Sequence, residues 1–320
     1  MADSGGERRP VLVQWILDTR NLWPEASKTK DLETVASRAL ALLTPEEKAG
    51  VLRYMFVRDA KMSLGSHLLK HYAVSRLHGV PWREAAITRD PRTKPVYRDP
   101  ATGGQPVSFN VSHQAGLVAL VAVARFDGEV EVGVDVVCAS ERRGRDHKMV
   151  AEEGWPAFVD MHADVFAPGE AAYLKFQVLS GGALPAGSSA EAVLDFKLRC
   201  FYALWCLREA YVKMTGEALL AKWLRELEFR AIRPPAVAAA SSSSSSDNEA
   251  QGGAVKVEEI WFQGQKVQDA NVCIRSWGPD YMTCTAVRTP GREADGLAFE
   301  LGPYEVLSMD EVLSFAESMM

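Results

Sequence analysis

Long apolar runs are missing from this 320-residue sequence: none approaches the roughly 18 consecutive residues of a membrane span. The N-terminal stretch "MADSGGERRP" also lacks the basic start and apolar core of a signal peptide. We therefore expect a cytoplasmic protein with no membrane partner.

Paired cysteines and several familiar motifs are missing too. The five cysteines contain no C-x-x-C pair, and their odd number indicates neither a disulfide framework nor a zinc ribbon, so we expect buried, reduced thiols. There is no Walker A loop and no G-x-S-x-G nucleophile elbow. His67 and His71 have the spacing of two metal ligands on a helix, but the glutamate of H-E-x-x-H is absent, which disfavours zinc.

Acidic residues are scarce between positions 48 and 98, where eleven Lys and Arg stand against three acids. The whole chain has a net charge of -6, so the remainder carries -14. A basic segment on an acidic protein argues against a nucleic-acid-binding protein and favours a confined anion site. Solvated Lys and Arg on helix faces are the alternative explanation of the same segment.

What the chain does contain is a mixed pattern of helices and strands, with 47% hydrophobic residues to build a core. The spacing predicts helices within 44–79, where Thr44 and Glu47 form a capping-box pattern and Gly79 a stop, within 168–176 and within 201–216. Alternating or continuous apolar runs predict strands at the beginning of 11–23 and near residues 106–113, 116–125, 129–137, 226–232, 258–267, 271–278 and 281–288.

Two segments read as insertions without regular structure. The stretch 179–192 precedes the last predicted helix, and the Ser-, Ala- and Gly-rich stretch 234–254 has too little apolar surface to order itself. A faint similarity between "RDAKMSLG" (58–65) and "REAYVKMTG" (208–216) would, if it reflects a duplication, imply two similar lobes.

The helix predicted at 201–216 carries charges inside an apolar sequence. Trp205, Glu209 and Lys213 are spaced i, i+4, i+8 and therefore share one stripe of the helix. An ordinary surface pair between Glu209 and Lys213 is one interpretation. The second interpretation is that Glu209 is a buried carboxylate, because the apolar residues around it leave little of the helix exposed. A buried carboxylate needs a cation or a metal as its partner.

Two predicted strands carry further polar candidates. Asp135 lies in "VGVDVV" with a glycine two residues before it, which would let another group approach closely; a turn-capping aspartate is the alternative. Ser112 and His113 are neighbours in "FNVSHQ", and neighbours on a strand point to opposite faces. This disfavours a nucleophile and base of a Ser-His hydrolase and suits contacts to an anion better.

Taken in order, "FNVSHQ", "VGVDV" and "WCLREAYVK" resemble the 4′-phosphopantetheinyl transferases, specifically the surfactin-type and eukaryotic aminoadipate-semialdehyde-dehydrogenase-activating group. The flanking "EEKAGVLRYMFVRDAKMSLGSHLLK" and "RTKPVY" extend the resemblance over most of residues 45–230. It implies an α/β (α+β) fold of two similar lobes related by pseudo-twofold symmetry. We expect an N-terminal lobe over residues 1–125 and a C-terminal lobe over residues 126–320.

The resemblance also implies roles for residues at the matching positions. Asp135 and Glu209 resemble the ligands of Mg²⁺ on the pyrophosphate of coenzyme A. Glu209 also resembles the base that activates the carrier serine, and Lys213 resembles a lysine that contacts the phosphates. Coenzyme A contacts are implied at Ser112, His113, Arg89 and Lys94, with Arg53 and Arg58 as candidates for the 3′-phosphate end.

The expected function is that of a monomeric enzyme that loads acyl, peptidyl or aminoadipate-type apo carrier domains from coenzyme A and releases 3′,5′-ADP. A noncatalytic coenzyme A- or nucleotide-binding adaptor is the alternative. The presence of Asp135, Glu209 and Lys213 in the same sequence weighs against it. The sequence departs from the family pattern at Val137, where bacterial members commonly carry a third acid, and at Arg208, where Lys is usual.

Overall fold

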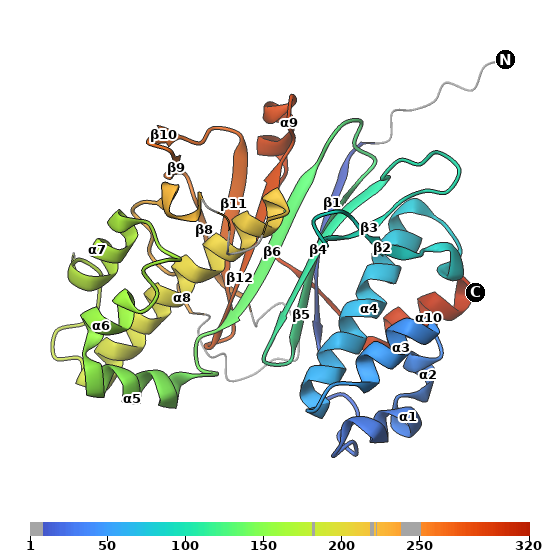
Figure 1. Cartoon of the computed structure of the whole chain (residues 1–320), viewed down its shortest axis with the longest axis horizontal. Helices are drawn as coiled ribbons and strands as arrows, with labels where there is room; N and C mark the ends of the chain where they lie inside the picture. Colours follow the sequence, from blue (N-terminus) through green and yellow to red (C-terminus); the bar gives the residue numbers. More distant parts are fainter. Residues whose placement is uncertain (1–8, 181–182, 218–220, 222, 238–250) are drawn as a thin grey trace. The chain divides into compact units, whose positions relative to one another are not determined.

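The computed structural model describes residues 9–180, 183–217, 221, 223–237 and 251–320, and it divides into two compact units (Figure 1). The first unit consists of Met1–Val132 with Val287–Met320, and the second of Gly133–Ala286. The observed division differs from the expected one between residues 125 and 126. The C-terminal segment returns to the first unit because its strand β13 (Glu305–Leu307) pairs in parallel with β1 (Val11–Asp18).

The first unit is built on a four-stranded sheet in the order β13-β1-β5-β4. The long helix α4 packs on β4 and β5, and the C-terminal helix α10 packs on α4 (Figure 1). Leu17, Leu64, Phe109 and Leu120 belong to the core that these contacts enclose. The other elements of this unit are η1 Thr29–Asp31, α1 Leu32–Val35, α2 Ser37–Leu40, α3 Pro45–Leu52, α4 Val57–His78, η2 Trp82–Glu84, β2 Ile87–Arg89, β3 Pro95–Tyr97, β4 Val107–Gln114, β5 Leu117–Ala124, α9 Glu293–Ala298 and α10 Met309–Ser318.

Local signals in the sequence set the ends of these elements. The predicted capping box forms at α3, where Thr44 Oγ1 accepts from the backbone N–H of Glu47 at 3.2 Å and the Thr44 N–H donates to Glu47 Oε2 at 3.1 Å. Helix α4 ends at Gly79, whose φ of 83° is readily adopted by glycine. Both predictions are confirmed.

The second unit contains a four-stranded sheet in the order β6-β12-β11-β8 and a small sheet in the order β10-β9-β7. Helix α8 packs on β11, and Phe201, Leu204, Val272 and Met282 belong to the core of this unit. Its elements are β6 Glu131–Cys138, α5 Arg143–Glu153, α6 Trp155–Asp160, α7 Pro168–Phe176, α8 Ala190–Thr215, η3 Leu224–Glu226, β7 Leu227–Phe229, β8 Gln251–Lys256, β9 Ile260–Phe262, β10 Gln265–Lys266, β11 Ala270–Trp277 and β12 Tyr281–Arg288.

Each unit thus combines a long helix with a four-stranded sheet, which agrees with the predicted α/β class. The two similar sequence segments, 58–65 and 208–216, lie on α4 and at the end of α8 respectively. Helix α8 begins after Ser189, whose Oγ accepts from the Ala192 N–H at 3.1 Å, and ends at Gly216 with φ 76°. The pseudo-twofold relation between the lobes stays a prediction.

The expectation of an unstructured insertion over 234–254 needs a correction at its C-terminal end. Residues 238–250 lie outside the described residues, but Gln251 begins strand β8, which pairs antiparallel with β11. The register places Ala254 opposite Arg275 and Gln251 opposite Trp277. Backbone pairing explains why a stretch of Gln, Gly and Ala with few apolar side chains joins the sheet.

The β8–β11 pairing determines how the chain should respond to deletions in this region. Removing residues 236–254 takes away four residues of β8, so we expect the free energy of unfolding to fall by about 1–3 kcal/mol through lost ladder hydrogen bonds. Removing only residues 239–249 leaves the ladder intact and should change the melting temperature little, because closure entropy varies slowly with loop length. Thermal melts of both variants beside the intact chain check this, and equal melting temperatures would contradict it.

Every helix in the described part of the chain is too short or too polar to traverse a lipid bilayer. All five cysteines lie among the described residues and are buried free thiols, as predicted: Cys138, Cys200, Cys206, Cys273 and Cys284.

Candidate functional site

A close approach of strand β6 to helix α8 creates the candidate site. A Cβ atom added to Gly133 would lie 2.0 Å from the Ala210 carbonyl oxygen and 2.5 Å from the Met214 nitrogen, so only glycine fits at this position. The sequence had singled out this glycine as a point of close approach, and the approaching element is α8. Asp135, two residues further along β6, is thereby held beside the same helix.

Asp135 and the helix charges meet at this contact. Lys213 Nζ donates to Asp135 Oδ1 at 2.6 Å, and Asp135 is buried while the Lys213 side chain keeps 27% of its exposure. Burial alone would lower the pKa of Lys213, but the Asp135 and Glu209 carboxylates raise it. The pKa of Glu209 is raised by burial and by the Asp135 carboxylate, and Lys213 opposes this rise. The three predicted residues therefore form one electrostatic cluster.

The stripe predicted on α8 is its partly exposed face. Trp205, Glu209 and Lys213 are all half-buried, whereas most of their neighbours on the helix are buried. One expectation changes: Glu209 is not fully buried, and the fully buried charge of this helix is Arg208. Glu209 therefore lies on the partly exposed side of the helix, while Arg208 is buried in the core.

Arg208 pairs with an acid that the sequence analysis missed. Its guanidinium donates to Glu170 Oε2 at 2.6 Å, to the Leu227 carbonyl at 2.7 Å and to the Leu224 carbonyl. Both charged side chains are fully inaccessible, and burial raises the pKa of Glu170 to about 7 although Arg208 opposes this shift. Glu170 also accepts from the Ala167 N–H at 2.8 Å, a common contact of a glutamate in the first turn of a helix. Its sequence position therefore gives no sign of the buried pair with Arg208.

The carboxylates of Asp135 and Glu209 fit a magnesium ion by their chemistry. Mg²⁺ takes oxygen ligands and commonly uses one or two carboxylates with water and phosphate oxygens. Lys213 already places a cation on Asp135, which shows that this spot favours positive charge. In the part of the chain that the structure describes, no three His, Cys, Asp or Glu side chains gather where they could hold a metal together, so water or other oxygen ligands would complete the shell around two carboxylates.

The basic candidates lie in the first unit. Arg89 and Lys94 belong to the β2–β3 hairpin, where Arg89 pairs with Pro95 and its Nη1 donates to the Thr93 carbonyl at 2.6 Å. Arg89 is exposed, whereas Lys94 is half-buried and donates to the Val132 carbonyl at 3.1 Å. Burial lowers the pKa of Lys94, and Glu131 and Asp90 oppose this. The hairpin thus presents two cations on one short element.

Arg53 and Arg58 flank the connection between α3 and α4 and are both exposed. Arg53 Nε donates to the Ala49 carbonyl at 3.2 Å, and the Arg58 guanidinium lies 5.3 Å from the centre of the Phe56 ring. Their exposure agrees equally with phosphate contacts and with the solvated-face interpretation.

Ser112 and His113 alternate on β4 as predicted. Ser112 is buried and pairs with Ala119, whereas His113 is exposed and pairs with Val118. Since the two side chains leave opposite faces of the strand, the geometry argues against a Ser-His nucleophile pair.

The two histidines with metal-ligand spacing face a carboxylate. His67 Nδ1 and His71 Nε2 each lie 3.0 Å from Glu47 Oε1, and these hydrogen bonds lower the pKa of Glu47 well below its usual range although burial raises it. Burial lowers the pKa of the neighbouring Lys70 to about 8, and Arg89 acts in the same direction. Lys70 is therefore a buried cation close to Arg89 that the sequence analysis missed, because nothing in a helical pattern distinguishes it from a surface lysine.

Two family models match the chain in succession. Residues 30–125 match the model described as 4′-phosphopantetheinyl transferase, N-terminal, and residues 131–259 match the 4′-phosphopantetheinyl transferase superfamily. The chain is also 48% identical over 314 residues to 4′-phosphopantetheinyl transferase 1 of Fusarium mangiferae, with 98% of each chain covered. The chain belongs to the 4′-phosphopantetheinyl transferase family.

More distant relatives give the same family. A 4′-phosphopantetheinyl transferase of Aureobasidium melanogenum is 35% identical over 344 residues, covering 95% of this chain and 97% of the relative. The human L-aminoadipate-semialdehyde dehydrogenase-phosphopantetheinyl transferase is 26% identical over 197 residues, 60% of this chain and 53% of the relative. The chain accordingly belongs to a family of enzymes that use coenzyme A and carrier protein domains as substrates, which favours the expected transferase over a noncatalytic adaptor.

Proposed function

We propose that the protein transfers the 4′-phosphopantetheine arm of coenzyme A to a serine of apo acyl, peptidyl or aminoadipate-reductase-type carrier domains, and that Asp135, Glu209 and Lys213 carry out this reaction. The observation that carries the proposal is the 2.6 Å contact of Lys213 with Asp135 beside the half-exposed Glu209. A strand and a helix thereby place two acids and a cation together, which suits binding and cleavage of a pyrophosphate.

The reaction divides among these side chains. The serine oxygen forms a bond to the phosphorus of the arm, the bond from that phosphorus to the departing 3′,5′-ADP breaks, and the serine proton passes to the Glu209 carboxylate. Lys213 supplies a positive charge next to the phosphates and offsets the negative charge that grows on the leaving group. Transfer of this kind is accelerated mainly by positioning and by charge neutralisation.

Asp135 and Glu209 would hold Mg²⁺, and Lys213, 2.6 Å from Asp135, is the permanent cation of the site. When bound, the ion neutralises pyrophosphate charge. The hard oxygen donors favour Mg²⁺ over softer metals. Cys206 Sγ lies 3.7 Å from the Asp135 carbonyl oxygen, and burial raises the pKa of this thiol well above its usual value, so it stays protonated and is a poor ligand.

The coenzyme A contacts are proposed from charge and exposure. Arg89 and Lys94 on one hairpin suit phosphate groups, Ser112 and His113 suit hydrogen bonds to the nucleotide, and Lys213 also contacts phosphate. Arg53 and Arg58 are proposed for the 3′-phosphate end because both are exposed arginines that flank the connection between α3 and α4.

Replacing Arg89 or Lys94 with Ala should raise the KM for coenzyme A about tenfold with little change in melting temperature, because a charge-assisted hydrogen bond contributes about 1.5–3 kcal/mol. Steady-state kinetics at saturating carrier measure this. Arg83→Ala is the matched control, since Arg83 is an exposed arginine of the same basic segment. Wild-type KM and kcat in both variants would assign Arg89 and Lys94 to a solvated face instead.

The proposed reaction is tested by weighing a carrier domain. After incubation of the protein with coenzyme A, Mg²⁺ and an apo carrier, the intact mass of the carrier should increase by one phosphopantetheine group. A carrier whose acceptor serine is changed to Ala should keep its mass. An unmodified wild-type carrier from each of the three proposed types would overturn the proposal.

The remaining parts of the proposal concern the state of the enzyme in the cell. We place it as a cytoplasmic monomer with neither nucleic acid nor membrane as partner, in keeping with its net charge of -6. Light scattering at working concentration tests the monomeric state, and a dimer mass would contradict it.

A further inference from the structure

Helix α4 carries a buried ammonium group that has no part in the reaction described above. Lys70 keeps 8% of its exposure, and its Nζ lies 3.5 Å from His67 Nδ1. Within the described ranges of the chain, Lys70 forms no ion pair with a carboxylate, whereas His67 and His71 both contact Glu47. A buried charge without a counter-ion is costly, so this ammonium group needs an acceptor that the described residues do not supply.

The acid that acts on Lys70 is already occupied by other donors. Glu47 accepts from His67 Nδ1 and His71 Nε2 at 3.0 Å each, and from the Thr44 N–H at 3.1 Å. Because an ionised carboxylate only accepts, His67 Nδ1 carries a hydrogen and cannot accept from Lys70. Burial accordingly lowers the pKa of Lys70 to about 8, and Glu47 opposes this only in part.

A second cation stands close to Lys70 on the β2–β3 hairpin. Arg89 also lowers the pKa of Lys70, since two positive charges near each other repel. The segment that leads into this hairpin packs on α4 beside Lys70, where the Trp82 ring lies 5.4 Å from the His71 ring between centres. One buried and one exposed cation therefore lie near each other in a place that an anion would stabilise.

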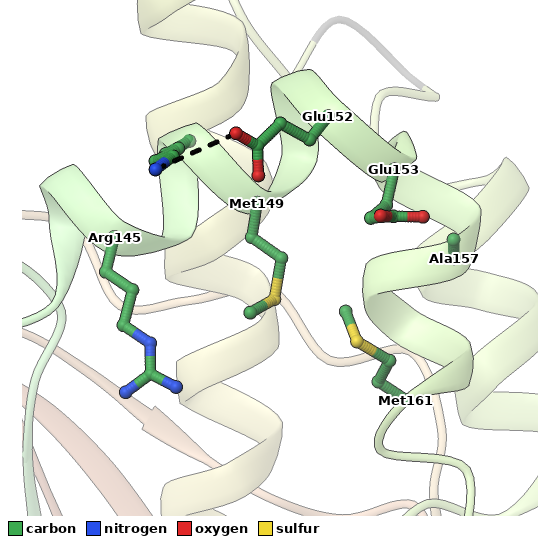
Figure 2. Close-up of a pocket in the computed structure, with 7 residues that line it drawn as sticks. Arg145, Met149, Glu152, Glu153, Ala157 and Met161 are labelled. Atoms are coloured by element: carbon green, nitrogen blue, oxygen red, sulfur yellow. Dashed lines mark ion pairs between the residues drawn. The ribbon is translucent and has the colours of Figure 1, made fainter.

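A hollow in the second unit is the contrasting case (Figure 2). Its volume is about 390 Å³, and its lining contains two cations and two acids: Arg145, Lys148, Glu152 and Glu153. The dashed line in Figure 2 marks the ion pair of Lys148 with Glu152 at 3.8 Å. The charges of this lining balance, so it does not favour an anion, whereas Lys70 and Arg89 form a pair of cations.

A phosphate group suits Lys70 and Arg89 by its chemistry. Its oxygens only accept hydrogen bonds when ionised, an ammonium group donates to one of them, and a guanidinium group donates to two. A phosphate that contacts both side chains gives the buried ammonium group its missing acceptor and removes the repulsion between the cations. Coenzyme A carries phosphate at its 3′ position and in its pyrophosphate.

We propose that Lys70 is a further binding residue for coenzyme A, which holds one phosphate group of this substrate together with Arg89 and makes the affinity for coenzyme A dependent on pH. This inference rests on the proposed function, because it takes coenzyme A as the ligand. The charged and titratable groups that face Lys70 are Glu47 from α3, His67 and His71 from α4, and Arg89 from β2.

Calorimetric titration of the full-length protein with coenzyme A tests the binding role without a carrier. Lys70→Met should raise the Kd at pH 7 about tenfold, whereas Lys70→Arg should keep it near the wild-type value. The melting temperature of Lys70→Met should stay equal or rise, because an apolar chain replaces an unpaired buried charge. A lower melting temperature with an unchanged Kd would instead make Lys70 a structural partner of Glu47.

Arg76→Met is the matched control for Lys70→Met, because it removes an exposed cation from the same helix. The Arg76 guanidinium lies 5.5 Å from the centre of the Phe315 ring, and we expect its loss to leave the Kd for coenzyme A unchanged. A tenfold rise in this control as well would assign the effect to the overall charge of the first unit and overturn the specific role of Lys70.

The pH profile of the Kd gives a second test. The affinity depends on protonated Lys70, so it should be constant between pH 6 and 7 and be lost as the pH rises through about 8. Lys70→Arg stays charged and should lack this loss up to pH 9.5. Lys94, whose pKa is also lowered by burial, is present in both proteins, so the difference between the profiles reports Lys70. Identical profiles would contradict the proposal.

Dephospho-coenzyme A, which lacks the 3′-phosphate, distinguishes the two sources of the phosphate group. A site for the 3′-phosphate predicts that Lys70→Met and the wild type bind this analogue equally, whereas a site for the pyrophosphate predicts the same tenfold difference as with coenzyme A. An unchanged Kd for coenzyme A in Lys70→Met, while the wild type binds it, would overturn the role of Lys70 alone. Failure of the wild type to bind coenzyme A would overturn the proposed function instead.

Discussion

We expect the replacement of Glu209 with Gln to lower the transfer rate by about 10²–10⁴-fold while the protein stays folded, because Gln keeps the size of the side chain but cannot accept the serine proton. It also removes one of the two carboxylates proposed to hold Mg²⁺. Asp135→Asn should behave alike. The rate of 3′,5′-ADP release at saturating substrates measures both losses, and far-ultraviolet circular dichroism with a thermal melt checks the fold.

The control for this experiment is Glu226→Gln, which makes the same chemical change at an exposed position of η3. Coenzyme A binding, followed by calorimetry, should persist in Glu209→Gln because the basic residues of the first unit are untouched. The simple alternative predicts otherwise: a Glu209 that serves only as a helix-surface partner of Lys213 contributes a few tenths of a kcal/mol, and its loss leaves turnover near normal.

Replacing Arg208, the residue before Glu209, should lower stability and leave coenzyme A binding unchanged. Arg208→Met leaves the carboxyl group of Glu170 buried without its cation, and breaking a fully buried ion pair costs about 3–5 kcal/mol. In addition, the carbonyl groups of Leu224 and Leu227 lose their donor. We expect the melting temperature to fall by roughly 10 °C, whereas the enzyme that remains folded keeps its KM for coenzyme A.

Arg225→Met is the matched control for Arg208→Met, since Arg225 is an exposed arginine on η3 and its loss should change stability by less than about 0.5 kcal/mol. The double variant Arg208→Met with Glu170→Gln should recover part of the loss, because the uncompensated buried charge is gone. A melting temperature of Arg208→Met equal to that of the control would contradict a structural role for the pair.

Strong local signals made several parts of the fold predictable from sequence. Thr44 and Glu47 set the start of α3, Gly79 and Gly216 set the ends of the two long helices, and Gly133 marked the approach of β6 to α8. Such signals act through backbone conformation and capping within a few residues, so a sequence pattern contains them.

Non-local pairing was harder to predict. The first unit takes back the C-terminal segment through β13 and β1, and β8 forms from a Gly- and Ala-containing stretch because its backbone pairs with β11. Neither pairing depends on a distinctive side-chain pattern. Backbone hydrogen bonds between distant segments carry little trace in either segment alone.

The residues of the candidate site also divide into those that the sequence predicts and those that depend on tertiary packing. Asp135, Glu209 and Lys213 could be found because charges in apolar surroundings need partners, and the structure brings these three together. Glu170 and Lys70 were missed because a first-turn glutamate and a helix lysine have ordinary roles in most proteins. Their burial depends on tertiary packing.

The most direct test of the central claim, that the cluster of Asp135, Glu209 and Lys213 works with a divalent ion to transfer phosphopantetheine, is the intact mass of an apo carrier after incubation with metal-stripped wild-type enzyme and coenzyme A. With excess EDTA we expect no mass increase, and on adding Mg²⁺ we expect every carrier molecule to gain one phosphopantetheine group. Full modification in the presence of EDTA would contradict the account.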